Sequence, residues 1–394
     1  MKTLKTCLLL LPAVLLAACD GGSNNDAPNF TDSAVISTRA PDYSSGAISL
    51  IATAAPFTAQ NSLAPSDSSD IFVRSGGDHY FVVKRFGTDQ VLRYSASNPT
   101  TPVYTYSTQD ATDGATRSNP SDLLIVSDTK AYLLRYGSGK LWIVNPSATS
   151  EATFKTGEID LSAYDVDGVP EMTAGIVRNG RLYVAMQRLE RFAAVKAGYV
   201  AVIDIATNAE IDTAPTVDGL KGIALPVRDP VSLVGIPGSN NILVLADGGY
   251  DGTFTQLYEG GIVRIDTAAN SATLTFDDGD STTHPFGYFA DIATVTADRA
   301  YFIGSTGFGA AQTLYRFNSN TSASAPVAVS GFEGVSLGSL AVDPNGKLWL
   351  TRTGSAAPGI TILDFVSGAE TVAAPLISTV LTPINIDFIT VPVL

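Results

Sequence analysis

The sequence predicts an all-β fold, namely a seven-bladed β-propeller with four-stranded blades, and three observations lead to it. Hydrophobic residues make up 45% of the 394 residues and charged residues 16%, which excludes disorder over most of the chain. No convincing amphipathic helix occurs; short runs of Val, Ile, Leu, Tyr and Phe are instead separated by Gly, Asn, Asp and Pro turns. These runs recur in a fixed order at a spacing of roughly fifty residues, which is typical of propeller blades.

The first two strands of each unit, A and B, form a strand–turn–strand motif. It recurs at 70–83, 122–135, 173–186, 232–245, 291–304 and 339–352. One position of strand B aligns the copies, with Leu243 in the fourth copy and an aromatic residue in the others: Tyr80, Tyr132, Tyr183, Tyr301 and Trp349.

Strands C and D follow each motif after a loop of variable length. Strand C is expected at 90–97, 140–147, 199–208, 261–270, 313–320 and 360–368. Strand D is expected at 103–107, 152–156, 209–213, 272–276, 326–330 and 371–375. The chain thus holds six full units, each with an inner strand A and an outer strand D.

The two ends of the chain supply the seventh unit. Residues 34–40, 46–52 and 56–60 match strands B, C and D without a preceding strand A, and residues 384–393 match strand A alone. Because a circular array must join its first and last blades, we expect 384–393 to pair with the strand that begins at Ala34. An open all-β solenoid, two sandwiches, and rings of six or eight blades are the alternatives.

The strand C motif resembles a known family. Residues 199–208 read YVAVIDIATN and residues 261–270 read GIVRIDTAAN. They resemble the repeats of the YVTN or YncE-like group of bacterial seven-bladed propellers, roughly V-x-V-I-D-x-x-T-N; the match is degraded in the other copies. The resemblance implies an envelope binding protein or scaffold, and some lipid-anchored relatives resemble capture proteins that sit on outer-membrane uptake channels.

The first 18 residues predict a bacterial lipoprotein signal peptide. Two lysines precede an apolar run, residues 8–16, which is too short to span a bilayer, and small residues follow. The segment Leu16-Ala17-Ala18-Cys19 resembles the lipobox of bacterial lipoproteins, which implies removal of residues 1–18 and acylation of Cys19, palmitate included. A plain secreted protein cut after Ala18 is the alternative, and it would leave Cys19 as an odd thiol.

The residues after Cys19 bear on location and domain organisation. Asp20 resembles the inner-membrane retention signal of enteric bacteria. We therefore expect a membrane-anchored lipoprotein of a Gram-negative cell envelope, on the periplasmic face of the inner membrane or on the outer membrane. Residues 19–33 are expected to form the lipidated cysteine and a flexible polar tether, and residues 34–394 the propeller.

Composition excludes several classes of function. Asp and Glu number 38 against 24 Lys and Arg, a net charge of −14, so nucleic-acid binding through the global field is not expected. Two Cys and two His in the whole chain exclude a Cys/His zinc site, a thiol enzyme and a disulfide framework. We predict no cofactor, no metal and no enzymatic activity. Carboxylate catalysis by the aspartates at the start of strand A is the remaining catalytic alternative.

Long loops concentrate on one face of the predicted ring, which we call the long-loop face. It carries the D–A and B–C loops, whereas the A–B turns of the opposite face are short. Long B–C loops are expected at 188–198, 247–260, 305–312 and 353–359. Loops on a rigid scaffold commonly carry function, so we place the binding site there.

Two polar series and a set of aromatic residues make up the predicted site. Acidic residues stand at the start of strand A: Asp70, Asp122, Asp291 and Asp387. Arginines stand at the end of strand B: Arg39, Arg85, Arg135, Arg188 and Arg352. The two rings should pair bidentately. They would then be either a structural collar between blades or a site whose free arginines grip an anionic ligand. The aromatic candidates in the loops are Tyr136, Phe192, Tyr250 and Phe308.

Two acidic turns raise calcium binding as an alternative. They are Asp277–Asp280 with His284, and Asp165–Gly168 with Glu171. Neither fits a twelve-residue EF-hand loop, so solvated acidic turns are expected there.

Together these observations predict a lipid-anchored, monomeric envelope binding protein that captures a small molecule or an envelope protein on the long-loop face. The expected setting is an uptake or transport complex with a channel or receptor. A protein assembly scaffold is the first alternative, and a carboxylate hydrolase or lyase is the second.

Overall fold

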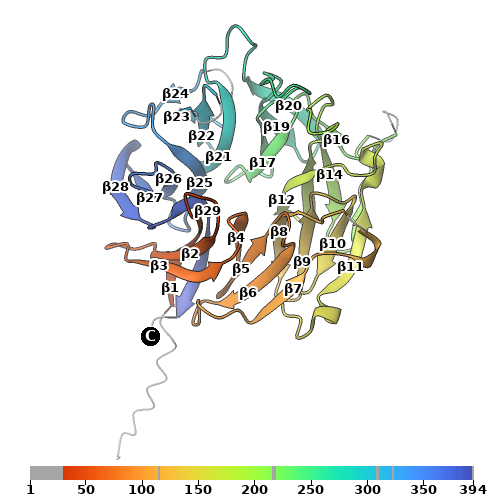
Figure 1. Cartoon of the computed structure of the whole chain (residues 1–394). Helices are drawn as coiled ribbons and strands as arrows, with labels where there is room; N and C mark the ends of the chain where they lie inside the picture. The colour runs from red at the N-terminus through yellow and green to blue at the C-terminus, as the bar shows by residue number, and fades with distance from the viewer. Residues whose placement is uncertain (1–29, 114–115, 215–218, 308–309, 322–323, 393–394) are drawn as a thin grey trace, which may run out of the picture.

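Seven antiparallel sheets are arranged in a ring around a central axis, and Figure 1 views the ring along that axis. The computed structural model describes residues 30–113, 116–214, 219–307, 310–321 and 324–392. Blade 1 consists of β29, β1, β2 and β3, and blades 2 to 7 follow in chain order from β4 to β28. A closed seven-bladed propeller with four-stranded blades is therefore confirmed.

The strands have the following bounds, from blade 1 to blade 7. Strands A are β29 (Thr382–Pro392), β4 (Ile71–Gly76), β8 (Pro120–Ser127), β12 (Met172–Arg178), β17 (Pro230–Gly235), β21 (Tyr288–Thr296) and β25 (Leu337–Val342). Strands B are β1 (Phe30–Arg39), β5 (His79–Lys84), β9 (Lys130–Arg135), β13 (Arg181–Met186), β18 (Ile242–Ala246), β22 (Arg299–Ser305) and β26 (Leu348–Arg352).

The outer strands and the short helices complete the blades. Strands C are β2 (Gly46–Ala52), β6 (Gln90–Ser95), β10 (Lys140–Val144), β14 (Tyr199–Asp204), β19 (Gly261–Asp266), β23 (Gln312–Phe317) and β27 (Gly359–Val366). Strands D are β3 (Ala59–Ser66), β7 (Tyr104–Ser107), β11 (Lys155–Asp160), β15 (Ala209–Glu210), β20 (Ser271–Asp277), β24 (Val327–Ala328) and β28 (Ala369–Ser378). The short strand β16 (Ile223–Ala224) also pairs with β14, and three 3₁₀ turns are η1 (Ala111–Asp113), η2 (Glu151–Thr153) and η3 (Ser162–Tyr164).

The last strand closes the ring as the sequence predicts. β29 pairs antiparallel with β1, which places Phe388 opposite Ala34 and Ile386 opposite Ile36. The first blade is thereby built from both ends of the propeller domain, and β29 supplies the inner strand A that this blade would otherwise lack.

The hydrophobic core is divided into seven clusters, each between two neighbouring blades. Each blade is covered on both faces, so strand B is apolar along nearly its whole length rather than alternating. The aligned position is buried in every copy, and its polar atom is hydrogen-bonded in several of them: Tyr132 donates to Asn208 Oδ1 at 2.7 Å and Trp349 Nε1 to Asp343 Oδ2 at 3.0 Å.

Two outer strands start later than expected, for a packing reason. In blade 1, strand D begins at Ala59 instead of residue 56, because Phe57 turns inward and packs edge-on against Trp349 of blade 7. In blade 3, η2 replaces the expected strand start, and Phe154 is buried beside Tyr104 and Tyr106 of blade 2 before β11 begins.

Candidate binding site on the long-loop face

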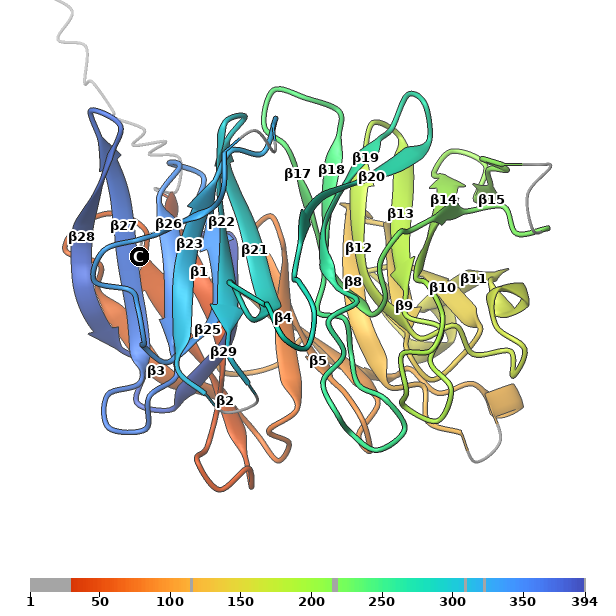
Figure 2. The same cartoon turned by 90° about the horizontal axis from the view of Figure 1, so that it is seen from above.

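The two faces of the ring differ as the loop lengths predict. In Figure 2 the B–C and D–A loops project from the lower edge of the ring, and the A–B and C–D turns project from the upper edge. The longest B–C loops of the described chain span residues 187–198 in blade 4 and 247–260 in blade 5, whereas the A–B turns of blades 2, 3 and 4 are two residues long. The long-loop face therefore has the room to build a site.

The inner strands line a central cavity of about 370 Å³, and their polar residues link neighbouring blades. Asp122 accepts the N–H groups of Leu123 at 2.8 Å and of Gly175, in the next blade, at 3.1 Å. Asp291 likewise accepts from Ile292 and from Leu340 of the next blade, both at 2.8 Å. Backbone donors hold these carboxylates in place, so they form a structural collar.

Arg74 supplies the guanidinium of this collar, and the sequence analysis missed it. Its Nε donates to Asp122 Oδ1 at 2.7 Å. Burial lowers the pKa of Arg74, but the carboxylates of Asp122, Asp387 and Asp291 raise it more. Burial in turn raises the pKa of Asp291 to about 6, against the effect of its hydrogen bonds.

The predicted ring of bidentate Asp–Arg pairs is wrong, because none of the five arginines forms such a pair with a predicted aspartate. Arg85 alone approaches a predicted partner, with its Nε 3.6 Å from Asp70 Oδ1. Arg135 is completely buried, ion-paired with Asp113 and stacked on Trp142.

The other three arginines contact aromatic rings. Arg39 lies over Tyr43, Arg188 over Tyr199 and Arg352 over Phe332. Arg188 also donates to the carbonyl of Tyr164 at 2.7 Å.

The strand register explains this error. The backbone N–H of Arg85 bonds to the carbonyl of Asp70, and the same bond joins Tyr136 to Asn119, Gln187 to Glu171, and Asp247 to Asp229. Arg85 therefore corresponds to Tyr136, whereas Arg135 lies one residue earlier and Arg188 one residue after Gln187. A shift of one residue turns a strand side chain to the opposite side.

Asp70 is also displaced from the collar. It corresponds to Asn119, Glu171 and Asp229, which lie at the rim of the ring. Asp122 and Asp291 occupy equivalent positions further along strand A, deeper in the ring. The carboxylate of Asp387 accepts the N–H of Ser75 in the next blade. Ser75 lies one residue later along strand A than the positions that Gly175 and Leu340 occupy in their blades.

A polar chain runs along the rim over blades 3, 4 and 5. Tyr136 donates to Gln187 Oε1 at 2.7 Å. Gln187 contacts Asp229, whose carboxyl group contacts that of Asp247. Asp229 is only 9% exposed, and its Oδ1 has no hydrogen-bond partner among the described residues. Burial raises the pKa of both aspartates, and the neighbouring Asp229 carboxyl raises that of Asp247 further.

Two further carboxyl groups lie near this pair. Burial raises the pKa of Glu171 to about 8, although the Leu189 N–H donates to it at 2.9 Å. Burial raises the pKa of Asp278 to about 7, although it accepts from the Gly260 N–H at 3.1 Å. Within the described ranges, no ion pair reaches Glu171, Asp229, Asp247 or Asp278.

The sequence analysis missed most of this rim because its members differ in residue type from blade to blade. The one available signal is positional: Asn119 and Asp229 each precede a proline that begins strand A. Both have a positive φ, 43° and 55°.

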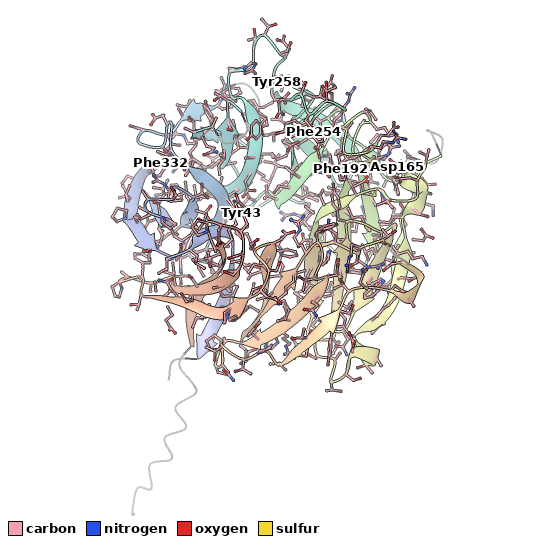
Figure 3. All side chains as sticks on the ribbon, viewed as in Figure 1. Tyr43, Asp165, Phe192, Phe254, Tyr258 and Phe332 are labelled. Atoms are coloured by element: carbon pink, nitrogen blue, oxygen red, sulfur yellow. The ribbon has the colours of Figure 1, made fainter. Side chains whose placement is uncertain are left out.

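Exposed aromatic side chains stand at the tips of four B–C loops. Tyr43, Phe86, Phe192 and Phe254 are 62%, 68%, 75% and 76% exposed. Tyr43, Phe192 and Phe254 adopt φ values of 60°, 72° and 61°, in the left-handed region that bulky residues rarely occupy. Figure 3 labels these three, and Phe192 and Phe254 lie on adjacent loops joined by a 2.9 Å bond from Ala194 N to the Tyr250 carbonyl.

The remaining predicted residues have mixed placements. Tyr136 and Tyr250 are partly buried, and Phe308 lies outside the described residues, as does Cys19. Among the described residues, no group of three or more His, Cys, Asp or Glu side chains is arranged to hold a metal ion. In the acidic turns proposed for calcium, Asp277 and Asp280 accept backbone N–H groups and Asp165 pairs with Lys196. No helix in the described ranges has the length and apolarity needed to cross a membrane.

Comparisons with known proteins support the fold and establish no function. No family model matches the chain, and no curated protein matches it. A protein of known structure from Lactobacillus plantarum is 12% identical to this chain with a TM-score of 0.62. The match covers 91% of this chain and 99% of that protein. A candidate 6-phosphogluconolactonase from Bacteroides uniformis is 14% identical with a TM-score of 0.60 and the same coverage. AztD from Citrobacter koseri is 13% identical with a TM-score of 0.50, covering 92% and 98%. At such identities the likeness is one of fold alone, and the chain is a seven-bladed β-propeller.

Proposed function

We propose that this protein is a lipid-anchored binding protein of a Gram-negative cell envelope that captures a ligand or partner on its long-loop face. Acylation of Cys19 would hold the propeller at the membrane through the segment before β1, which begins at Phe30 instead of after the expected tether end at residue 33. The proposed setting is an uptake or transport complex, in which an envelope channel or receptor is the partner. This setting follows from the resemblance of the repeats at 199–208 and 261–270.

The observation that supports binding most strongly is the set of exposed aromatic loop tips. Tyr43, Phe192 and Phe254 combine high exposure with a positive φ. An exposed aromatic side chain in that conformation contributes little to folding and costs roughly 1–3 kcal/mol of backbone strain. Tyr and Phe are enriched at protein interfaces, so a role in recognition accounts for both features.

The central cavity supports this choice of face, because its polar residues are occupied by contacts within the ring. Its carboxylates at Asp122, Asp291 and Asp387 are held by backbone donors and stabilise the ring. Ligand contacts are therefore assigned to the rim, to Asp70 and Arg85 and the loops above them. Arg135 is not assigned a binding role because it is completely buried.

A carboxylate hydrolase or lyase is the second candidate, and one observation favours it. Asp229 and Asp247 form a buried carboxyl pair in contact, which is the arrangement that general acid–base chemistry uses. The catalysts would then be this pair rather than Asp70, Asp122 and Asp291.

Co-purification from the native envelope tests the proposal. The full-length tagged protein is extracted from membranes, and bound proteins and small molecules are quantified by mass spectrometry. The double variant Phe192→Ser and Phe254→Ser should recover about tenfold less of a specific partner, which corresponds to a loss of about 1.4 kcal/mol of binding free energy. The matched control, Val103→Ser with Val366→Ser, alters two exposed apolar residues near turns of the opposite face and should keep it. Equal recovery by both double variants would overturn the proposal.

A further inference from the structure

Three loops next to the aromatic tips carry only negative charge among Asp, Glu, Lys and Arg. They are residues 161–171, 247–260 and 278–287, and we call them the acidic loops. Their carboxylates include Asp167, Asp251 and Asp280 at the surface, and none of the three loops contains a Lys or Arg. The surface carboxylates of these loops therefore favour a cationic partner on this sector of the long-loop face.

The basic side chains next to these loops are largely engaged. Lys196 lies 3.0 Å from both Asp165 and Glu190, and Arg188 donates to the carbonyls of Tyr164 and Ala197. Arg228 donates to the Ala194 carbonyl and lies 3.7 Å from Glu259, so Arg191 remains the exposed cation of this sector.

Beneath the loops, two buried carboxyl groups have an unsatisfied oxygen. Asp229 Oδ1 and Asp278 Oδ1 have no hydrogen-bond partner among the described residues, and both side chains are at least nine-tenths buried. Asp278 belongs to the loop 278–287, and the carbonyl of Asp229 accepts the N–H of Asp247 in the loop 247–260. Burial disfavours the charged form of both carboxyl groups, and a cation seated above them would favour it.

The aromatic tips complete the chemistry of the sector. Phe192 and Phe254 stand on adjacent loops, and a backbone bond between Ala194 and Tyr250 fixes one loop against the other. The face of a phenyl ring attracts ammonium and guanidinium groups, with a gain of about 0.5–1 kcal/mol at an exposed site. A ligand that bears several cations on a flexible chain matches rings and carboxylates spread over neighbouring loops.

We propose that the sector formed by the acidic loops, Phe192 and Phe254 binds a basic polypeptide segment, one rich in Lys or Arg, of a partner protein. This inference rests on the proposed function and names the chemical class of the partner. A metal ion is a poor match, because among the described residues no group of three or more acidic side chains is arranged to hold one. The carboxylates lie on separate loops, as a chain of separate cations requires.

Peptide binding by the full-length protein in non-ionic detergent tests the inference. Fluorescence anisotropy is measured with labelled deca-arginine and deca-glutamate, and spermidine serves as a competitor. Deca-arginine should bind at least a hundredfold tighter than deca-glutamate, and its affinity should fall as salt is raised. Asp251→Asn with Asp280→Asn removes two surface charges from the acidic loops and should weaken binding about tenfold, and Phe192→Ala with Phe254→Ala about fivefold.

A charge-matched control separates this sector from general attraction. Asp128→Asn with Asp298→Asn removes the same charge from exposed turns of the opposite face and should change the affinity less than twofold. A loss equal to that of the Asp251 and Asp280 variant, or no loss in the phenylalanine variant, would overturn the inference. So would deca-arginine binding no tighter than deca-glutamate, or spermidine binding as tightly as deca-arginine. If the peptide fails while Phe192 and Phe254 still determine co-purification, the partner class is wrong and the binding face stands.

Discussion

The carboxylate of Asp387 accepts a 2.8 Å hydrogen bond from the backbone N–H of Ser75, 312 residues earlier in the chain. Asn385, two residues before it, accepts from the N–H of Val73 at 2.9 Å. The closing strand β29 is thus held by β1 within its own blade and by side-chain bonds to β4 of the next blade. Ring closure depends on specific polar contacts as well as on strand pairing.

Asp387→Ala should destabilise the propeller by about 2–4 kcal/mol. The change removes the acceptor for two backbone donors, Ser75 and Phe388, and leaves both donors unsatisfied. Urea unfolding monitored by fluorescence measures the effect. Asp298→Ala, at an exposed turn, is the control and should cost less than about 0.5 kcal/mol. Equal stability of the two variants would argue against a role for Asp387 in closure.

Arg135→Ala and Arg85→Ala should separate a structural arginine from a surface one. Arg135 is completely buried, so its loss leaves Asp113 unpaired and opens space beside Trp142; we expect a cost of about 3–5 kcal/mol. Arg85 is partly exposed and lies 3.6 Å from Asp70, so its loss should cost less than about 1 kcal/mol. Thermal and urea unfolding of both variants check the order, and a reversed order would contradict the assignment.

Glu171→Gln and Asp278→Asn should each stabilise the protein at pH 8 but not at pH 5. Burial raises the pKa of Glu171 to about 8 and that of Asp278 to about 7, so the folded state holds these protons more tightly than the unfolded state. Their contribution to stability is therefore fully present below about pH 4 and is lost as the pH rises to 7–8. Neutral amides should recover on the order of 1–3 kcal/mol at pH 8. A gain that is the same at both pH values would rule out titration as its cause.

Cys19→Ala should abolish membrane anchoring if the lipobox prediction holds. The variant should incorporate no labelled palmitate and should appear in the soluble fraction after cell lysis, because several acyl chains are needed for stable attachment. Asp20→Ser, which keeps the cysteine, should remain labelled and move from the inner to the outer membrane on a density gradient. Unchanged palmitate labelling of Cys19→Ala would contradict the lipobox prediction.

The architecture could be predicted from the sequence because it depends on repetition. Tyr80, Tyr132, Tyr183, Tyr301 and Trp349 recur with their strands, and a buried position in a ring must be filled in every blade. The incomplete units at the two ends then required the pairing of β29 with β1. Strand D was the exception, because Phe57 and Phe154 pack against neighbouring blades and shift the strand starts.

The site was predictable only as a face of the ring. The loop lengths distinguish the two faces, as the structure shows, but the Asp–Arg pairing failed because a one-residue offset between Arg85 and Arg135 reverses the side chain. Sequence alignment of short strands does not resolve that offset. The contact between Asp229 and Asp247 depends on tertiary structure. Neither residue belongs to a repeated type, and only the proline after Asp229 sets that aspartate apart in the sequence from solvated ones.

Site-specific photo-crosslinking in intact cells tests the central claim, capture on the long-loop face, most directly. Benzoylphenylalanine replaces Phe192 or Phe254 on that face and Val103 or Val366 near turns of the opposite face, all exposed positions. We expect a discrete crosslinked partner from the two phenylalanine positions and none from the two valine positions. Crosslinks from Val103 and Val366 alone, or equal crosslinks from all four positions, would contradict the account.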